Sequence, residues 1–424
     1  MDVHHSQRSR ATLVRSFSLA AVLAASVALA GTTPALAADQ APLKVGFISS
    51  LSGYFAAPGK YMEEGLKLYL QEHDYTIAGR KIVLDIADDQ GNPAVGLTQL
   101  RRLVEQDHVD VIFGPLSAAV GSAMATYLDA HKMPAVYPIV SSDDLTQRTP
   151  AAYVVRTGWT SSQTTQPLGD YAYKTLKYRK VATIGYDFSF GWESIGGAVA
   201  TFQDDGGKVV KQIWTPLSTT DFSPYLSELP RDVDAVFCSY SGSQAVNFMK
   251  QYKAFGLKIP LVCQGNSTDE STLQATGSAA LGTVTALQYS AALDTTTNKK
   301  FVAAYTKAYG HGPSYYGEGT YVGAMVLAGG IEALHGNVSD PAAFVKALRS
   351  VNLTNAPRGS VTFDAYGNPV ENVYIRKVED VGGQLANVVI KIDRNVSQFW
   401  TYDPAAFLRH PVYSRNYPPC NDCK

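Results

Sequence analysis

The sequence has few cysteines, no surplus of either charge and only one long apolar run. Four cysteines in 424 residues are too few for a fold held together by disulfides. The 36 basic residues are balanced by 37 acidic ones without a long like-charged run, which argues against a nucleic-acid partner. Beyond the N-terminal region, no stretch approaches the roughly 18 apolar residues that a membrane-spanning helix needs.

The one long apolar run lies near the N-terminus and is typical of a signal peptide. Three arginines precede small apolar residues from Phe17 to Ala30, and Ala35-Leu36-Ala37 fits a small-residue cleavage site. We therefore expect residues 1–37 to be removed and the mature protein to be a soluble periplasmic protein. Removing 37 of the 424 residues leaves 387, enough for two domains.

Motifs for catalysis or metal binding are missing. Gly-x-Ser-x-Gly and His-Glu-x-x-His do not occur, and the histidines have no partner pattern. Asp88-Asp89 follows a predicted strand and is expected to form a turn and cap. We expect no enzymatic activity, no cofactor and no metal. The single C-x-x-C, Cys420 to Cys423, lacks the second pair of a zinc site and predicts a tail disulfide, whereas Cys238 and Cys263 are either buried thiols or a bridge.

The segment from residue 109 to residue 144 has the pattern of a β-α-β unit. Val109–Phe113 and Pro134–Pro138 read as buried strands, and Val120–His131 between them has apolar residues on one helix face. The two strands are then parallel, with their following loops at the carboxyl edge, where ligands of α/β sheets bind. Ser117 and Ser141-Ser142 lie in those loops and can hold an anionic group. The alternative is that these serines only cap helices.

Strand and helix patterns alternate along most of the chain in two consecutive series. Leu43–Ser49 and Lys81–Ala87 are strands of the first series. The second series begins with the strand Lys180–Tyr186 and the helix Ser194–Asp204. Such alternation is typical of parallel sheets covered by helices. Two series of similar length predict two similar α/β lobes.

Several short motifs occur in the order and spacing of one family. They are Ser52-Gly53, Asp88-Asp89, Phe113-Gly114-Pro115 with Ser117, Leu145-Thr146, Gly191, and Arg358-Gly359 through Phe363-Asp364 with Gly367. With them the chain, from about Lys44 to Asp393, resembles the periplasmic substrate-binding proteins of ABC importers. The group concerned includes the leucine/isoleucine/valine-, amide- and urea-binding proteins.

The resemblance implies a type I periplasmic binding protein of class α/β. Two Rossmann-like lobes with parallel sheets are joined by three crossovers, expected near Thr157–Thr160, Tyr289 and Phe363–Gly367, with the ligand in the interlobe cleft. Lobe 1 comprises residues 43–158 plus 290–362, lobe 2 comprises residues 159–289 plus 363–393, and a tail covers residues 394–424. The implied partners are a small-molecule ligand, an inner-membrane ABC permease and its ATPase, and the protein is expected to be a monomer.

The resemblance also places a binding site. The serine after Gly-Pro and the next loop hold the ligand carboxylate, an aromatic residue before glycine stacks on the ligand, and the ends of two later strands complete the site. One further candidate, Tyr54, is not carried over from the family. It is an aromatic residue in the loop after the first strand of this sequence. The candidate residues are Ser117, Val140, Ser141, Ser142, Phe190, Tyr240, Asn266 and Tyr54.

The sequence departs from the family where an amino-acid ligand is bound by its ammonium group. The loop Gln264–Ser267 has no acid, and the nearest, Asp269, lies several residues further on. A buried ammonium without a carboxylate partner costs on the order of 2–5 kcal/mol. Either Asp269 takes that role or the ligand has no ammonium, so an aromatic or amide acid and a branched-chain amino acid both stay open. The rival functions are a soluble ligand-sensing partner of a membrane receptor and a cleft hydrolase.

Overall fold

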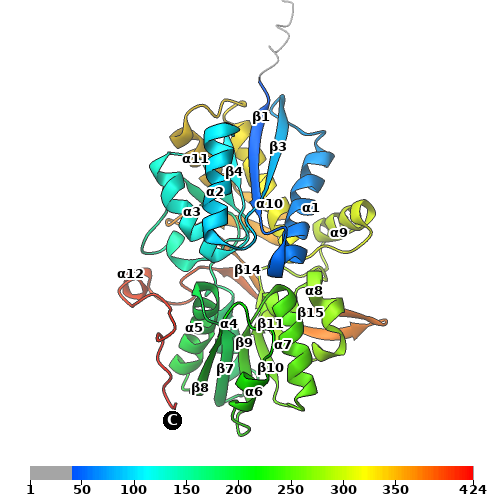
Figure 1. Cartoon of the computed structure of the whole chain (residues 1–424), viewed down its shortest axis with the longest axis vertical. Coiled ribbons are helices and arrows are strands. Elements are labelled where there is room, and N and C mark those ends of the chain that lie inside the picture. The colour runs from blue at the N-terminus through cyan, green and yellow to red at the C-terminus, as the bar shows by residue number, and fades with distance from the viewer. Residues whose placement is uncertain (1–40, 424) are drawn as a thin grey trace, which may run out of the picture. The chain divides into compact units, whose positions relative to one another are not determined.

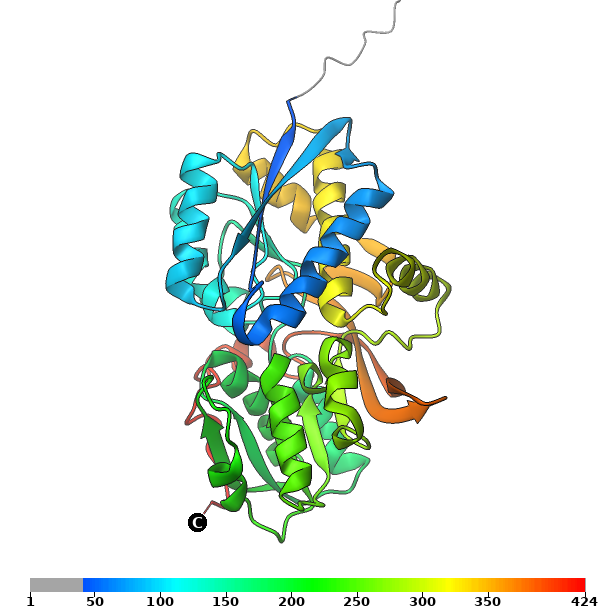
Figure 2. The same cartoon turned by 45° about the vertical axis from the view of Figure 1, so that its right-hand side comes forward.

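The computed structural model describes residues 41–423 (Figure 1). The predicted cleavage after Ala37 therefore lies outside the described residues. Within this range the strands form two sheets, and helices cover both faces of each, as two views show (Figures 1 and 2). No helix among the described residues combines the length and apolar character required to cross a membrane.

The first sheet has the strand order β2-β3-β1-β4-β5-β6 and is parallel apart from the β2–β3 pair. Its strands are β1 (Leu43–Ser49), β2 (Thr76–Ile77), β3 (Arg80–Asp88), β4 (Val111–Phe113), β5 (Ala135–Tyr137) and β6 (Val154–Arg156). The helices that follow these strands or pack against them are α1 (Ala56–Glu72), α2 (Pro93–Arg101), α3 (Ala118–Ala130), α10 (Tyr315–Ala333) and α11 (Pro341–Arg349). The predicted β-α-β unit is thus β4-α3-β5.

The second sheet has the order β12-β13-β14-β11-β10-β9-β7-β8, with β15 paired to β14. Its strands are β7 (Lys180–Tyr186), β8 (Lys208–Thr215), β9 (Ala235–Ser239), β10 (Leu261–Gln264), β11 (Val284–Leu287), β12 (Leu353–Ala356), β13 (Gly359–Phe363), β14 (Pro369–Val381) and β15 (Gln384–Val396). The remaining helices are α4 (Thr165–Lys174), α5 (Ser189–Asp204), α6 (Ser223–Ser227), α7 (Gly242–Ala254), α8 (Glu270–Thr276), α9 (Thr296–Tyr309) and α12 (Pro404–Phe407). Strands β7 to β11 run parallel, whereas β14 joins β11 antiparallel.

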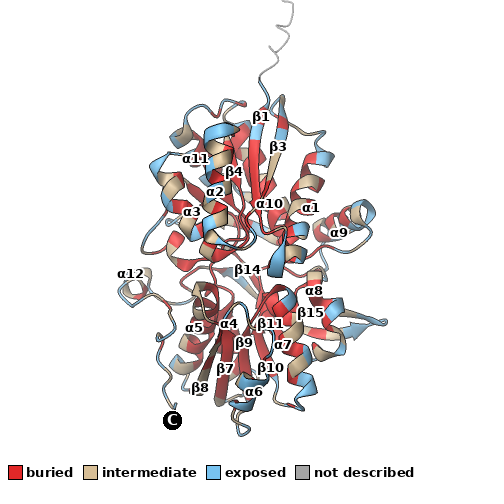
Figure 3. Cartoon of the chain, viewed as in Figure 1, coloured by how far each residue is buried: buried red, intermediate tan, exposed pale blue. Residues whose placement is uncertain are grey.

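The central strands of both sheets are buried, as Figure 3 shows by colour. In β1, Val45 and Phe47 have no exposed surface, and neither has Ile48, which points to the opposite face. Helices on both faces explain why the sequence of this strand is a continuous apolar run without alternation. The loops at the carboxyl ends of these strands are held in place by this core.

The chain passes three times between the two lobes. Strands β12 and β13 are joined to β14 in the second sheet but pack against Val322 of α10, which belongs to the first lobe. The chain leaves β6 for α4 and β7, returns from β11 to α9 and α10, and goes back from β13 into β14. These are the three predicted crossovers, so the predicted fold class is confirmed. Strand β13 pairs with β12 and also with the start of β14. The residue boundaries of the lobes stay a prediction.

Some elements differ from the sequence prediction. Helix α5 begins at Ser189 and not at Ser194, because Phe188 is extended and Gly191 allows the first turn to lie against the carbonyl group of Tyr186. A side chain at Gly191 would collide with that carbonyl group. Helices α4 and α8 were not predicted. In α4 the signal was present but short, since Leu168, Tyr171 and Ala172 are spaced as on one helix face and are buried.

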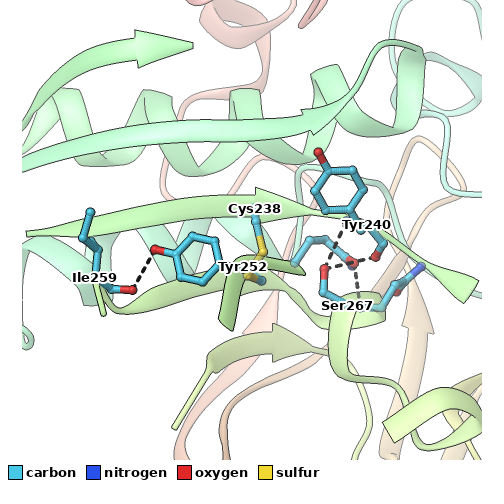
Figure 4. Close-up of a disulfide and its surroundings, with 8 residues drawn as sticks. Cys238, Tyr240, Tyr252, Ile259 and Ser267 are labelled. Atoms are coloured by element: carbon cyan, nitrogen blue, oxygen red, sulfur yellow. Dashed lines mark hydrogen bonds between the residues drawn. A yellow bond between two sulfur atoms is a disulfide. The ribbon is translucent and has the colours of Figure 1, made fainter. Parts of the chain in front are cut away.

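Both pairs of cysteines form disulfides. Cys238 and Cys263 lie opposite each other on β9 and β10, with 4.4 Å between their Cα atoms (Figure 4). Cys420 and Cys423 form the expected bridge in the tail. Nearby, the backbone N–H of Asp422 donates to the carbonyl oxygen of Val209. The tail thereby covers part of β8, the edge strand of the second sheet.

Candidate functional site

A pocket lies where strand ends and helix starts of both lobes converge. The empty space at this pocket, part of which is open to solvent, is about 350 Å³. The lining residues are Phe55, Leu116, Ser117, Ala118, Ile139, Ser141, Trp159, Tyr186, Phe188, Phe190, Ser241, Asn266, Tyr315 and Tyr316. Most of them follow a strand of one of the two sheets or open a helix, which is the edge where ligands of parallel α/β sheets bind.

The first lobe contributes two serine hydroxyls and a helix start. Ser117 is the N-cap residue of α3, but its side chain makes no cap hydrogen bond. The Oγ of Ser141 accepts a hydrogen bond of 2.9 Å from the Oγ of Ser161, so its own hydrogen can be donated to a ligand. The first N–H groups of α3 lack partners within the helix. Together these donors favour an anionic group.

The second lobe and α10 contribute a group that we call the polar corner, consisting of Ser241, Asn266, Tyr315 and Tyr316. The hydroxyls of Tyr316 and Ser241 are 2.7 Å apart, and Nδ2 of Asn266 donates to the Tyr316 hydroxyl at 3.3 Å. Burial raises the pKa of both tyrosines above its ordinary value. Their hydroxyls therefore stay protonated and act as neutral hydrogen-bonding groups.

Aromatic rings form much of the remaining wall. The Trp159 ring meets the rings of Phe190 and Tyr315 edge-on, with 6.3 Å between centroids in each pair. Phe188 lies beside Tyr186 and Phe190, at centroid distances of 5.2 and 6.2 Å. Such a wall suits a flat apolar group, which it can contact through ring faces and edges.

No lining residue is an Asp, Glu, Lys, Arg or His, and all fourteen belong to the described part of the chain. Asp269, which the sequence left as a possible ammonium partner, does not line the pocket. One of its oxygens accepts from the backbone N–H of Ser271 at 2.9 Å, and the other accepts from that of Tyr315 at 3.3 Å. Burial raises its pKa to about 7. Asp269 therefore holds the starts of α8 and α10 in place.

Four of the eight candidate residues come together in the pocket, namely Ser117, Ser141, Phe190 and Asn266. Phe190 lies on the first turn of α5, and Asn266 lies in the 3-10 turn Gly265–Thr268 after β10.

The side chains of the other four candidates are engaged elsewhere. Val140 packs on Gly121 of α3, and the Ser142 hydroxyl bonds to Ser122 Oγ at 2.8 Å and to the Ala118 carbonyl oxygen at 3.1 Å. Val140 and Ser142 flank Ser141 in the sequence. In extended backbone, neighbouring side chains point to opposite sides, so these two point away from the pocket that Ser141 lines.

Tyr240 lies in the core of the second lobe, where its hydroxyl is 3.1 Å from that of Thr215 and its ring packs on Phe248. Its backbone is bonded to the Ser267 hydroxyl (Figure 4). Tyr54 is 41% exposed. Neither lines the pocket.

Sequence reasoning missed several lining residues. Trp159 comes from the first crossover, which shows no periodic pattern, and Tyr186 ends β7. Ser241 immediately follows Tyr240, and this neighbouring residue, not Tyr240, lines the pocket. The pair Tyr315-Tyr316 was noted as aromatic, but its place at a helix start beside Asn266 depends on tertiary packing.

Two α/β lobes linked by three crossovers, with a pocket between their carboxyl edges, define a two-lobed solute-binding protein. The family model described as periplasmic binding protein matches residues 42–384. The chain belongs to this family, and the predicted function as a solute-binding protein is confirmed.

Three similar proteins illustrate the range of the family. The Leu/Ile/Val-binding protein homolog 6 of Brucella melitensis is 33% identical over 346 residues, 79% of this chain and 87% of its own. A second similar protein is a solute-binding protein of an ABC transporter from Rhodopseudomonas palustris BisB5, solved in complex with 3,4-dihydroxybenzoic acid. It is 33% identical with a TM-score of 0.80, and the match covers 84% of this chain and 98% of that one. Another, from R. palustris in complex with benzoate, is 28% identical with a TM-score of 0.79, covering 84% and 97%.

Proposed function

We propose that the chain captures a small aromatic carboxylate in this pocket and delivers it to an ABC importer. The observation that carries the proposal is the composition of the wall, in which seven of the fourteen lining residues are aromatic and none is an acid. The solved complexes with benzoate and with 3,4-dihydroxybenzoic acid support it, because aromatic acids occupy proteins of the same fold.

The carboxylate is bound by the first lobe. Ser117, Ser141 and the free N–H groups at the start of α3 offer neutral donors. Each hydrogen bond to a charged group contributes roughly 1.5–3 kcal/mol, so two or three of them hold a carboxylate without an arginine. The ring then lies against the wall that Trp159 and Phe190 form together.

A branched-chain amino acid fits this wall less well. Its ammonium group needs a carboxylate, and the pocket has none because Asp269 is committed to two backbone N–H groups. Leaving the ammonium unpaired weakens binding by on the order of 2–5 kcal/mol. A micromolar site would then become a millimolar one, since each factor of ten corresponds to about 1.4 kcal/mol.

The cellular setting follows from the family. We propose that the protein is exported after cleavage behind Ala37, acts as a monomer in the periplasm, closes its lobes on the ligand, and presents the closed form to an inner-membrane permease with its ATPase. It performs no chemistry on the ligand. Scattering should show compaction when a verified ligand is added, because the ligand binds the closed state better.

Calorimetric titration with benzoate, 4-hydroxybenzoate, leucine and isoleucine tests the ligand class. We expect the two aromatic acids to bind and the two amino acids to bind at least about 30-fold more weakly. Ser117→Ala and Ser141→Ala should weaken both aromatic acids alike, whereas Ser350→Ala, an exposed serine at the end of α11, should leave both unchanged. Tight leucine binding without binding of either aromatic acid would overturn the proposal.

A further inference from the structure

Two polar groups of the polar corner are buried without a partner. The Tyr315 hydroxyl and Oδ1 of Asn266 make no hydrogen bond of good geometry with any described residue, although the Tyr315 hydroxyl lies near the side chains of Tyr316 and Asn266. Tyr315 is fully buried, Asn266 is 5% exposed, and both line the pocket. Buried polar atoms are nearly always paired in proteins, so two unpaired ones that face the same pocket point to a ligand group that pairs with them.

The backbone of both residues is held in place, and the Tyr315 ring also packs against the rings of Trp159 and Tyr316, with centroids 6.3 and 4.0 Å away. The backbone N–H of Tyr315 donates to Asp269, and that of Asn266 donates to Oε1 of Gln264 at 2.7 Å. The Asn266 amide is further held by the Tyr316 hydroxyl, which also contacts Ser241. The corner is therefore built in advance of the ligand.

A hydroxyl group satisfies this corner better than any other small substituent. An amide has a donor on one side and an acceptor on the other, and whichever one bonds to Tyr316, the remaining one faces the pocket. A tyrosine hydroxyl can likewise donate or accept. A phenolic hydroxyl on the ligand both donates and accepts, so it pairs with Tyr315 and Asn266 in either arrangement. A bare ring leaves both groups unpaired.

Trp159 Nε1 is a third unpaired polar atom in the wall. It can only donate, so it suits a carboxylate oxygen as well as a hydroxyl. The choice of ring substituent thus depends on Tyr315 and Asn266.

We propose that Tyr315 and Asn266 bind a hydroxyl group on the ring of the ligand, so that the protein selects hydroxylated aromatic acids over unsubstituted ones. This inference rests on the proposed function, because it places an aromatic carboxylate in the pocket. Tyr315 and Asn266 are then the residues that determine specificity, whereas the serines of the first lobe bind the carboxylate common to all such acids.

Calorimetry with benzoate, 4-hydroxybenzoate, 3-hydroxybenzoate and 4-aminobenzoate tests the inference on the unaltered protein. At least one hydroxybenzoate should bind about tenfold or more tightly than benzoate, the effect expected of one to two net hydrogen bonds. The amine donates well but accepts poorly, so 4-aminobenzoate should fall between them. Equal affinities for benzoate and both hydroxybenzoates would overturn the inference but leave the proposed function standing. Failure of every aromatic acid would overturn both.

Tyr315→Phe gives the second test. It should reduce the preference for the hydroxylated acid to about threefold or less while leaving the affinity for benzoate nearly unchanged. Because the Tyr315 hydroxyl makes no hydrogen bond of good geometry with the described residues, the ligand-free variant should melt close to the unaltered protein. An equal loss of affinity for both acids would overturn the inference.

The matched control is Tyr186→Phe. Tyr186 lines the same pocket, but its hydroxyl already donates to the carbonyl oxygen of Ser241 at 2.9 Å. This variant should change the affinities for both acids by the same factor, so their ratio should stay as in the unaltered protein. A ratio that falls in Tyr186→Phe as far as in Tyr315→Phe would also overturn the inference.

Discussion

The backbone N–H of Asp143 donates a hydrogen bond of 3.3 Å to Oε2 of Glu193. Asp143 follows β5 of the first sheet, and Glu193 lies on α5 beside the second, so the contact joins the two lobes. Both carboxyl groups are buried, and the cation that acts on both of them is the buried Arg156. Burial, reinforced by repulsion between the two acids, raises the pKa of Glu193 well above its usual range, and burial raises that of Asp143 to about 6.

A raised carboxyl pKa makes the folded state less stable as the pH rises. Below about pH 4 these acids are protonated in the folded and unfolded states alike, so they cost nothing. Between about pH 4 and pH 8 the unfolded state ionises first and the folded state loses stability. Glu193→Gln removes one of these acids. It should therefore raise stability at about pH 8 by on the order of 1–3 kcal/mol and change little at about pH 4.

Thermal melts across this pH range measure the effect. Other buried acids, including Asp269, contribute slopes of the same sign, so the difference between variant and parent is the quantity to follow. Glu228→Gln, which alters an exposed acid paired with Lys211, should change the stability by less than about 1 kcal/mol at any pH and should not raise it at about pH 8. A Glu193→Gln curve parallel to that of the parent would contradict the prediction.

A second buried arrangement of one arginine and two acids lies at the crossovers. Nε of Arg358 is 3.4 Å from Oε2 of Glu371 on β14 and 3.7 Å from Oε1 of Glu318 on α10. Arg358 also donates to the carbonyl oxygen of Thr157 at 2.7 Å, so it links the first crossover to α10 and β14. Arg358→Met should lower the free energy of unfolding by about 3–5 kcal/mol, because it leaves buried acids without their cation.

Chemical denaturation checks this loss, and a compensating variant separates charge from packing. Changing both glutamates to glutamine in the Arg358→Met background removes the unpaired charges and should restore at least half of the lost stability. Arg394→Met, at an exposed position on β15, should cost less than about 0.5 kcal/mol. If Arg358→Met were as mild as Arg394→Met, the arginine would not be holding the crossovers.

Gly65 allows α1 and α10 to pack backbone against backbone. A Cβ atom at Gly65 would collide with the carbonyl oxygen of Gly317 and with Oγ1 of Thr320. Gly65→Ala should therefore destabilise the protein by about 1–3 kcal/mol, although alanine is the better helix former. Gly312→Ala is the matched control, since nothing lies within 4 Å of the added atom. Chemical denaturation of both variants measures the two losses of stability. Equal losses in Gly65→Ala and Gly312→Ala would contradict the prediction.

The sequence predicts strands better than it predicts the site, and particular residues show why. The strands Leu43–Ser49 and Lys180–Tyr186 have the predicted bounds, because a continuous run of β-branched and apolar residues is a local signal. The choice of Ser141 over Ser142 as a lining residue depends on which side chain the start of α3 captures. Trp159 reaches the pocket from a crossover without any pattern. Convergence of distant segments is a property of tertiary packing, which no local pattern encodes.

Arg148 attaches the C-terminal tail to the first lobe. Its guanidinium donates to the carbonyl oxygen of His410 at 2.9 Å and to that of Phe407 at 3.2 Å, and lies 5.6 Å from the centroid of the Phe407 ring. Further contacts hold the tail to the second lobe, among them the hydrogen bond of 2.6 Å from the Tyr402 hydroxyl to Asp204. The tail thus bridges the lobes outside the three crossovers.

Arg148→Ala should free the part of the tail next to the first lobe and leave the rest attached. Hydrogen exchange should speed up across residues 404–411 but not across residues 420–423, where Val209 pairs with Asn421 at 2.9 Å. Losing these charge-assisted hydrogen bonds should cost about 1–3 kcal/mol. The control is Arg415→Ala, whose arginine is 58% exposed and pairs with Asp187 at the surface, an interaction worth less than about 1 kcal/mol. Because the tail would then restrain closure less, the Arg148 variant should also compact more readily on binding. Equal exchange rates in the two variants would show that the tail is held by the second lobe alone.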